Sequence, residues 1–268
     1  MLLPRVLTAL ILALSFGWML FESSSQAWQA LALFIAVVAA WEWCGFAKVS
    51  NSYLKALFSI GFSSVVYVMY LGLSDASLMV MTLISMGLMF TSVYRYQTSQ
   101  GQAVVTQRTA VLMLGLLVMV PFFVSLIRFR DSFSPELMLL SLFIIWAIDT
   151  GAFFSGRRFG KHKLAYYVSP GKTWEGVIGG GLLALVVAYI GMLWWAPAIS
   201  SPVWLMSLGM AFIGLYSVFG DLFESLLKRQ VGLKDSGKLL PGHGGILDRI
   251  DSMIIAIPMF YFFWKWAL

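Results

Sequence analysis

The chain has 268 residues, of which 60% are hydrophobic and only 11% are charged, and its mean hydropathy is +0.86. Soluble domains carry about 25% charged residues, so this composition excludes a soluble protein and indicates an integral membrane protein. A single cysteine excludes a disulfide framework, and two histidines are too few for a histidine-rich metal centre, so a bound metal would need oxygen ligands. The net charge of +6 suits a protein that works against anionic lipid headgroups.

Apolar runs along the chain predict an all-α, polytopic membrane protein with about nine transmembrane helices, because a spanning helix needs about 20 mainly apolar residues. The first run follows Arg5 and ends near Ser25-Gln26-Ala27, which resembles a signal-peptidase site. We expect an uncleaved anchor there, since eight more runs follow. The nine runs are 6–21, 27–47, 54–73, 76–94, 109–127, 136–155, 176–196, 203–222 and 252–267.

Lysine and arginine are unevenly divided between the two sides of these predicted spans. Loops on the N-terminal side hold 15 of the 18, and the opposite side holds only Arg128, Arg130 and Lys265. Cytoplasmic loops carry the excess of positive charge, so we expect the N-terminus to be cytoplasmic and the C-terminus to lie outside. The two loops richest in charge, 156–175 and 223–251, would then face the cytoplasm, where nucleotides are.

Acidic residues are also unevenly placed, with seven of the twelve between 149 and 251. We therefore predict an N-terminal transmembrane scaffold of about five helices over 1–135 and a catalytic transmembrane region over 136–268. One half carries the polar residues, which argues against an inverted-repeat transporter with two matching halves. Glu42, between two tryptophans in the scaffold, fits either a cavity or the membrane interface.

Two pairs of carboxylates lie at the helix ends that border the second charged loop. Asp221 and Glu224 are three residues apart and Glu224 and Lys228 are four apart, so all three share one helix face. Asp248 and Asp251 lie one helical turn apart where the ninth run begins. A solvated helix end would also explain the first pair, and the preference of helix N-termini for acids, worth ~0.3–1 kcal/mol, would explain the second.

Taken together, the four carboxylates favour a metal site with oxygen ligands. Mg²⁺ takes one or two carboxylates and completes its octahedron with waters and substrate phosphates. The candidate metal ligands are Asp221, Asp248, Asp251 and Glu224.

A glycine-rich turn, Pro241-Gly242-His243-Gly244-Gly245, lies between these acid pairs. Glycines let backbone N–H groups crowd around an anion, because no Cβ blocks the approach. A flexible linker is the plain alternative, but charged residues flank the turn on both sides. We expect His243 either to contact a phosphate or to cap the following helix.

A second polar segment precedes the seventh run. Gly171-Lys172-Thr173 suggests a P-loop, but that motif needs a glycine where Tyr166 stands. Ser169, Lys172 and Thr173 would instead hold phosphates near a helix N-terminus. The basic residues 157–163 also fit a positive-inside loop. Asp149 lies inside an apolar run, where an acid normally faces a polar cavity or a partner.

The stretch from Ser225 to Asp251 resembles the signature of the phosphatidate cytidylyltransferases (CDP-diacylglycerol synthases). That signature, S-x-x-K-R-x₄-K-D-x-G-x₂-L-P-x-H-G-G-x-x-D-R-x-D, is met at fourteen fixed positions over 27 residues. The D-x-G-A segment at Asp149 and the block 169–176 look like the family's other shared segments. The resemblance is strong over 145–252, and one departure is Tyr166-Tyr167, where many bacterial members carry Pro-Lys.

The resemblance implies transfer of a cytidylyl group from CTP to phosphatidic acid, with release of CDP-diacylglycerol and pyrophosphate. It implies a requirement for Mg²⁺, and the family admits a monovalent cation such as K⁺ beside it. It also implies a homodimer in a bacterial-type inner (plasma) membrane, with an active site open to the cytoplasm and to the lipid. No nucleic-acid partner is expected.

By analogy with the family, Asp221, Asp248 and Asp251 would be metal-site carboxylates, and the residue types and their spacing suggest the other roles. The residues expected to be catalytic are Asp221, Lys228, Arg229, His243, Asp248, Arg249 and Asp251. Those expected to bind substrate phosphates or the nucleotide are Asp149, Ser169, Lys172, Thr173, Glu175, Lys234, Asp235, Gly244 and Gly245.

The expected chemistry needs no strong general base, because the attacking lipid phosphate is already anionic. Such a transfer depends mainly on positioning and on electrostatic stabilisation of the phosphates, and we expect one in-line displacement at the α-phosphorus. Two alternatives remain: a CTP-dependent lipid kinase, which would release CDP, and a lipid or phosphate transporter, which would carry polar residues through both halves of the membrane.

Overall fold

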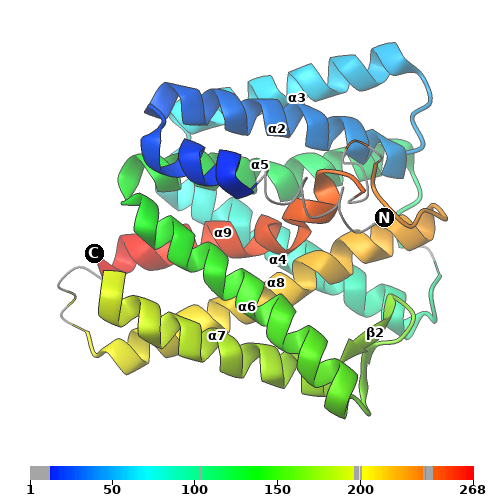
Figure 1. The fold of residues 1–268 in the computed structure, drawn as a ribbon. Coiled ribbons are helices and arrows are strands. Elements are labelled where there is room, and N and C mark those ends of the chain that lie inside the picture. Colours follow the sequence, from blue (N-terminus) through cyan, green and yellow to red (C-terminus); the bar gives the residue numbers. More distant parts are fainter. Residues whose placement is uncertain (1–12, 103, 196–198, 200, 238, 240–243) are drawn as a thin grey trace.

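The computed structural model describes residues 13–102, 104–195, 199, 201–237, 239 and 244–268. Residues 13–22 are helical, and they precede eight longer helices and one β-hairpin (Figure 1). In chain order these elements are α2 (Ser25–Phe46), α3 (Ser52–Gly72), α4 (Asp75–Thr98), α5 (Arg108–Ser132), α6 (Pro135–Phe159), β1 (Lys163–Ala165), β2 (Ser169–Thr173), α7 (Trp174–Trp195), α8 (Val203–Gln230) and α9 (Leu247–Ala267).

Seven of these helices, α2 to α8, are long and apolar enough to cross a membrane. This confirms the prediction of a helical, polytopic membrane protein. The helix α9 is not among the seven, because Asp251 and Lys265 lower its hydropathy near both ends. Part of the predicted first span lies outside the described residues. The count of nine spans and the sides of the two termini stay predictions.

The centre of the helix bundle is α5, which packs against α2, α3, α4 and α9. In the apolar stretch of α5, 72% of the residues are buried. The corresponding value for α3 is 17%, so α3 lies at the periphery of the bundle. Buried tryptophans need partners for their indole N–H groups, and two of them use α5. The indole of Trp28 donates to the carbonyl of Leu126 at 3.2 Å, and that of Trp43 donates to the carbonyl of Val111 at 2.9 Å.

Several helices begin where the sequence supplies a side-chain cap. Asn51 accepts hydrogen bonds from the N–H groups of Tyr53 and Leu54, and Ser74 accepts one from the N–H group of Ser77. Such caps satisfy backbone donors that have no partner within the helix. They fix the starts of α3 and α4, which are joined by a two-residue link.

The helices α6 and α7 lie side by side along much of their length (Figure 1). Glycines make this close approach, since a Cβ at Gly180 would come within 2.6 Å of the Ile148 carbonyl oxygen and one at Gly151 within 2.8 Å of the Gly179 carbonyl oxygen. Small residues allow helix backbones to meet in this way in membrane proteins. The packing fixes the end of α6 that carries Asp149 against the start of α7.

The connection between α6 and α7 is an antiparallel hairpin in which Lys163 pairs with Thr173 and Ala165 pairs with Ser169. We predicted this segment only as a charged loop. The hairpin leads directly into α7, where the hydroxyl of Thr173 accepts a hydrogen bond from the N–H group of Gly176 at 3.1 Å. Thr173, a predicted phosphate contact, thus caps α7 while it also lines a cavity.

Candidate active site

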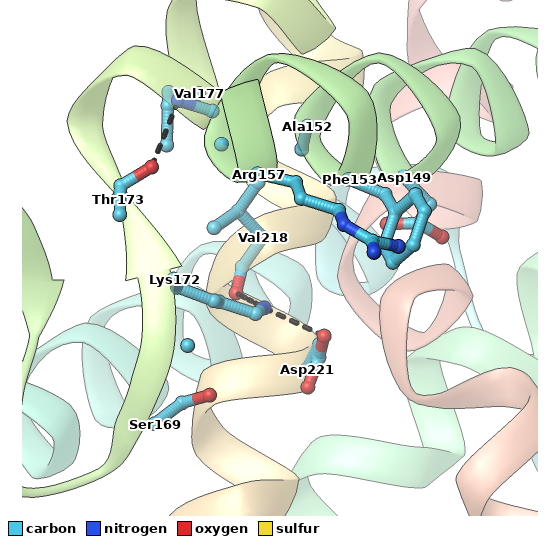
Figure 2. A pocket seen from close by; sticks show the side chains of 13 residues that line it. Asp149, Ala152, Phe153, Arg157, Ser169, Lys172, Thr173, Val177, Val218 and Asp221 are labelled. Atoms are coloured by element: carbon cyan, nitrogen blue, oxygen red, sulfur yellow. Dashed lines mark hydrogen bonds and ion pairs between the residues drawn. The ribbon is translucent and has the colours of Figure 1, made fainter. Parts of the chain in front are cut away.

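A cavity of about 520 Å³ opens between α6, β2, the start of α7 and α8 (Figure 2). Its volume falls in the range of pockets for small ligands and cofactors. Polar groups from three parts of the chain meet there. The charged and hydroxyl side chains on its walls are Asp149, Arg157, Ser169, Lys172, Thr173 and Asp221.

The shortest polar contact in this cavity joins β2 to α8. The Nζ atom of Lys172 lies 2.6 Å from Oδ2 of Asp221, and it also lies 3.4 Å from the carbonyl oxygen of Val218 (Figure 2). Both side chains are only partly exposed, at 24% and 30%. A predicted phosphate-binding lysine and a predicted metal ligand, 49 positions apart, are therefore direct neighbours.

Arg157 is a residue that the sequence did not single out, since its segment also fitted a positive-inside loop. It lines the cavity together with Asp149, Ala152, Phe153 and Gly156. These positions follow the spacing of one face of a helix. Counted from Asp149 along the helix, this spacing places Arg157 on the same face, and it was the signal in the sequence that could have identified Arg157.

A second charged cluster lies at the end of α8, and its centre is Lys228. The Nζ atom of Lys228 lies 2.5 Å from Oε2 of Glu224 and 2.7 Å from Oδ1 of Asp248. Glu224 and Lys228 are buried. The predicted contact between these two residues is therefore confirmed, but the helix end is not solvated.

Asp248 also organises the segment that leads into α9. Its Oδ2 atom accepts hydrogen bonds from the N–H and hydroxyl groups of Ser236, both at 2.9 Å, and from the N–H group of Gly245 at 2.8 Å. Partial burial alone would raise the pKa of Asp248, but the Lys228 ammonium and these N–H donors outweigh it and hold the pKa below its usual range. Asp248 is therefore an ionised carboxylate at neutral pH.

Asp251 lies near Asp221 through the contact between α8 and α9. Gly220 packs against the backbone of Asp251, so that a side chain at 220 would collide with the Asp251 carbonyl. The Oδ1 atom of Asp251 accepts hydrogen bonds from the N–H and hydroxyl groups of Ser252, at 2.7 and 3.1 Å. The glycine thus brings α9 close to the acid at the cavity wall.

The four predicted metal ligands do not gather into one cluster. In the described part of the chain, no three Asp, Glu, His or Cys side chains lie close enough together to hold a metal ion. Asp221 pairs with Lys172, whereas Glu224 and Asp248 pair with Lys228.

The carboxylate chemistry nevertheless fits a divalent cation. The Oε1 atom of the buried Glu224 has no hydrogen-bond partner among the described residues, whereas its Oε2 atom contacts the Lys228 ammonium at 2.5 Å. Asp221 faces the cavity. Since Mg²⁺ needs only one or two carboxylates beside waters and phosphates, these acids are suitable donors.

A model of the cytidylyltransferase family matches residues 3–267. The chain belongs to this family. A phosphatidate cytidylyltransferase of Pseudomonas aeruginosa is 37% identical over 97% of this chain and 96% of the relative.

Other relatives align over a shorter stretch. A phosphatidate cytidylyltransferase of Haemophilus influenzae is 46% identical over 56% of this chain and 55% of its own length. One of Bacillus subtilis is 43% identical over 51% of this chain and 50% of its own length. These two alignments span about half of each relative.

Among the described residues, the other predicted site residues do not line the cavity. Arg229, Lys234, Asp235 and Arg249 are exposed, and Arg229 donates to the carbonyl of Leu233 at 3.4 Å. Glu175 accepts hydrogen bonds from the backbone of His162 and lies 2.6 Å from its Nδ1 atom, which ties the hairpin to α7. Gly244 and Gly245 precede α9, and His243 lies outside the described residues.

Proposed function

We propose that this chain transfers the cytidylyl group of CTP to phosphatidic acid, giving CDP-diacylglycerol and pyrophosphate for phospholipid synthesis. The observation that carries the proposal is the cavity in which Lys172, Arg157, Asp149 and Asp221 meet, within a chain that belongs to the cytidylyltransferase family along nearly its whole length. The cationic side chains of Lys172 and Arg157 suit the phosphates of both substrates.

The residues of the cavity suit a reaction between two polyanions. Lys172 and Arg157 offset the charge on the phosphates and hold them in place, which is the main demand of phosphoryl-type transfer. The phosphate oxygen of the lipid is the attacking atom and needs no base, and pyrophosphate leaves from the α-phosphorus. Lys172 donates to Asp221 in the structure, so a bound phosphate would compete with Asp221 for the lysine.

Mg²⁺ is part of this proposal, with K⁺ as an additional cation. Asp221 and Asp251 lie on helices that touch where Gly220 packs against the Asp251 backbone; these two acids would hold the Mg²⁺, and Glu224 and Asp248 would complete the acidic surroundings. When bound, Mg²⁺ would neutralise phosphate charge and so favour departure of pyrophosphate.

An apolar groove beside the cavity suits the acyl chains of phosphatidic acid. Its volume is about 480 Å³, and it shares Val177 and Val218 with the polar cavity. Its other lining residues come from α4, β1, α7, α8 and α9, all of them apolar or aromatic: Met86, Gly87, Phe90, Leu164, Trp174, Phe212, Leu215, Tyr216, Phe219 and Ile255. A polar pocket that continues into an apolar groove fits a lipid with a phosphate headgroup.

The remaining parts of the proposal concern location. We place the protein as a multi-pass protein in a bacterial inner membrane, with the cavity open to the cytoplasm, and as a homodimer. The unequal division of lysine and arginine supports this orientation. The seven candidate spans support the multi-pass placement.

The deciding experiment follows the products. Purified protein in mixed micelles with phosphatidic acid, CTP and Mg²⁺ should release one pyrophosphate for each CDP-diacylglycerol formed. Chelation of Mg²⁺ should stop the reaction, and added Mg²⁺ should restore it. Release of CDP with transfer of the γ-phosphoryl group would instead identify a lipid kinase. Movement of phosphatidic acid across proteoliposomes without any turnover would identify a transporter.

A further inference from the structure

Glu42 is a buried acid that reaches from the N-terminal scaffold into the segment between α8 and α9. It lies near the end of α2 with only 6% of its surface exposed. Its Oε1 atom accepts a hydrogen bond from the N–H group of Ile246 at 3.1 Å, and its Oε2 atom accepts one from the N–H group of Leu247 at 2.9 Å. A buried carboxylate is costly unless it is hydrogen-bonded, and these two donors meet that demand.

These hydrogen bonds cap α9 from a distant part of the chain. The first N–H groups of a helix have no partner within it, and no side chain at the N-cap position of α9 supplies one. Glu42 does so from more than 200 positions away. A negative charge at a helix N-terminus is also favoured by the helix dipole.

Two glycines of the family signature make room for Glu42. A Cβ at Gly245 would lie 2.5 Å from the Oε2 atom of Glu42, and a Cβ at Gly237 would lie 2.8 Å from its Cδ atom. Both distances are too short for any real side chain. The Glu42 carboxylate therefore leaves no room for a side chain at Gly237, and together with the Ser236 hydroxyl it leaves none at Gly245.

Ser236 connects Glu42 with Asp248. Its hydroxyl oxygen lies 3.2 Å from Oε2 of Glu42 and 2.9 Å from Oδ2 of Asp248. A serine hydroxyl carries a single proton, so it donates to one of the two carboxylates at a time. The same Asp248 oxygen accepts from the N–H group of Gly245, which packs against Glu42.

We propose that Glu42 is a positioning residue for the transfer reaction. It fixes Ser236, Gly245 and the first turn of α9, and these groups hold Asp248 in its ion pair with Lys228. Glu42 is not one of the residues that line the cavity, so it acts through this segment and not on a substrate. The expected effect of Glu42 on turnover rests on the proposed function, whereas its expected effect on the order of the segment before α9 does not.

The first test measures backbone amide exchange of the full-length protein in detergent. Glu42→Gln replaces one of the two acceptor oxygens with an NH₂ donor, so at least one of the Ile246 and Leu247 amides loses its acceptor and should exchange at least tenfold faster. Glu22→Gln, a change at an exposed acid of the preceding helix, is the matched control and should leave them unchanged. Unaltered exchange in Glu42→Gln would overturn the proposal.

The second test separates positioning from simple loss of folded protein. Glu42→Gln should raise the Mg²⁺ concentration for half-maximal rate at least fivefold and lower kcat about tenfold, and Glu42→Asp, which keeps the charge, should recover part of both. A lower amount of folded enzyme would reduce kcat alone. Faster exchange with wild-type kinetics would overturn the catalytic part. Should the wild-type chain show no turnover, the proposed function fails and exchange alone decides the structural part.

A double-mutant cycle provides a test that does not depend on activity. Gly237→Ala should lower the Tm of the wild-type chain, because the new methyl group meets the Glu42 carboxylate. In a Glu42→Ala background the space is free, so the same change should have little effect. Contacting residues are expected to be non-additive in this way. Equal effects in both backgrounds would overturn the proposal, and Glu42→Ser serves as the background if Glu42→Ala does not accumulate.

Discussion

At the scale of single residues, two adjacent arginines at the end of α6 have different surroundings. Both side chains are exposed, but only Arg157 lines the polar cavity. Both would count equally toward the positive charge of a cytoplasmic loop. A comparison of variants at these two positions therefore distinguishes a phosphate-binding role from a role in membrane orientation.

We expect Arg157→Gln to lower kcat/KM for CTP by ten- to a hundredfold, because a hydrogen bond to a charged group contributes about 1.5–3 kcal/mol. Arg158→Gln is the matched control and should stay within about twofold of the wild type, since surface charges contribute little. Steady-state kinetics of pyrophosphate release measures both. Equal losses in the two variants would assign Arg157 to the solvated loop.

Two of the predicted metal ligands differ in how much structure depends on them. Asp221 pairs with one partly exposed lysine and accepts one hydrogen bond from the Ser225 hydroxyl, whereas Asp248 accepts four hydrogen bonds from Lys228, Ser236 and Gly245. Removal of one partner of a buried ion pair costs about 3–5 kcal/mol. Asp248 thus has a structural role in addition to its proposed place near the metal.

Asp221→Asn should abolish turnover with little change in Tm, and Asp248→Asn should abolish turnover and lower the Tm by several degrees. The difference follows from the buried Lys228 that Asp248→Asn leaves beside Glu224. Thermal unfolding in detergent, run beside the activity assay, measures both effects. Full activity in Asp221→Asn would remove Asp221 from the metal site.

The sequence could predict contacts within one helix but not those between distant segments. The spacing of Glu224 and Lys228 predicts their contact, and the structure confirms it. The pairs formed by Lys172 with Asp221 and by Glu42 with Leu247 lie far apart in the sequence. No periodicity relates such positions, because only the packing of helices brings them together.

At the scale of elements, the sequence predicted the helices well and missed the hairpin. Apolar runs locate α2 to α8, since each of these helices is long and apolar enough to be recognised as a candidate span from the sequence. The strands β1 and β2 have only three and five residues, and their charges resemble those of a loop. Their pairing depends on the close contact of α6 with α7, which the glycines of both helices permit.

The apolar groove allows a test in which one side chain is added. Gly87 lines the groove, and a Cβ at this position meets nothing within 4 Å. Gly87→Phe should therefore fill the groove and raise the KM for phosphatidic acid about tenfold or more, because each displaced CH₂ contributes about 0.8 kcal/mol. The KM for CTP should stay unchanged.

The matched control for this variant is Gly61→Phe on α3, where a Cβ also meets nothing within 4 Å. Gly61 does not line the groove, so its replacement should leave both KM values unchanged. Kinetics with long-chain and short-chain phosphatidic acid at saturating CTP makes the comparison. A Gly87→Phe enzyme with normal lipid kinetics would exclude the groove as the acyl-chain site.

At the scale of the whole molecule, the arginines that depart from the positive-inside pattern have structural partners. Arg128 donates to the carbonyls of Tyr70 and Leu73 at the end of α3 and pairs with Asp75 at 2.9 Å. Arg130 donates to the carbonyl of Leu20 at 2.7 Å. Cations at helix C-termini are favoured by the helix dipole, so contacts within the protein account for these two arginines. They therefore do not argue against the predicted orientation.

Chemical labelling from one side of the membrane tests this orientation. Cys44, the only cysteine, is buried, and Cys44→Ser gives a background without thiols. A cysteine at the exposed Lys161, which precedes the hairpin, should react with an impermeant maleimide in inside-out vesicles only. A cysteine at the exposed Ala76 at the start of α4 should react in right-side-out vesicles only. The reverse pattern would place the cavity outside the cytoplasm.

The contact of Glu42 with the segment before α9 has a consequence for how relatives can be recombined. The acid belongs to the part of the chain before residue 135, and the glycines that accommodate it, Gly237 and Gly245, belong to the part after it. A chimera that joins residues 136–268 to the first half of another relative will keep this segment ordered only if that half supplies an acid at the corresponding place in α2. The two halves therefore do not behave as interchangeable modules.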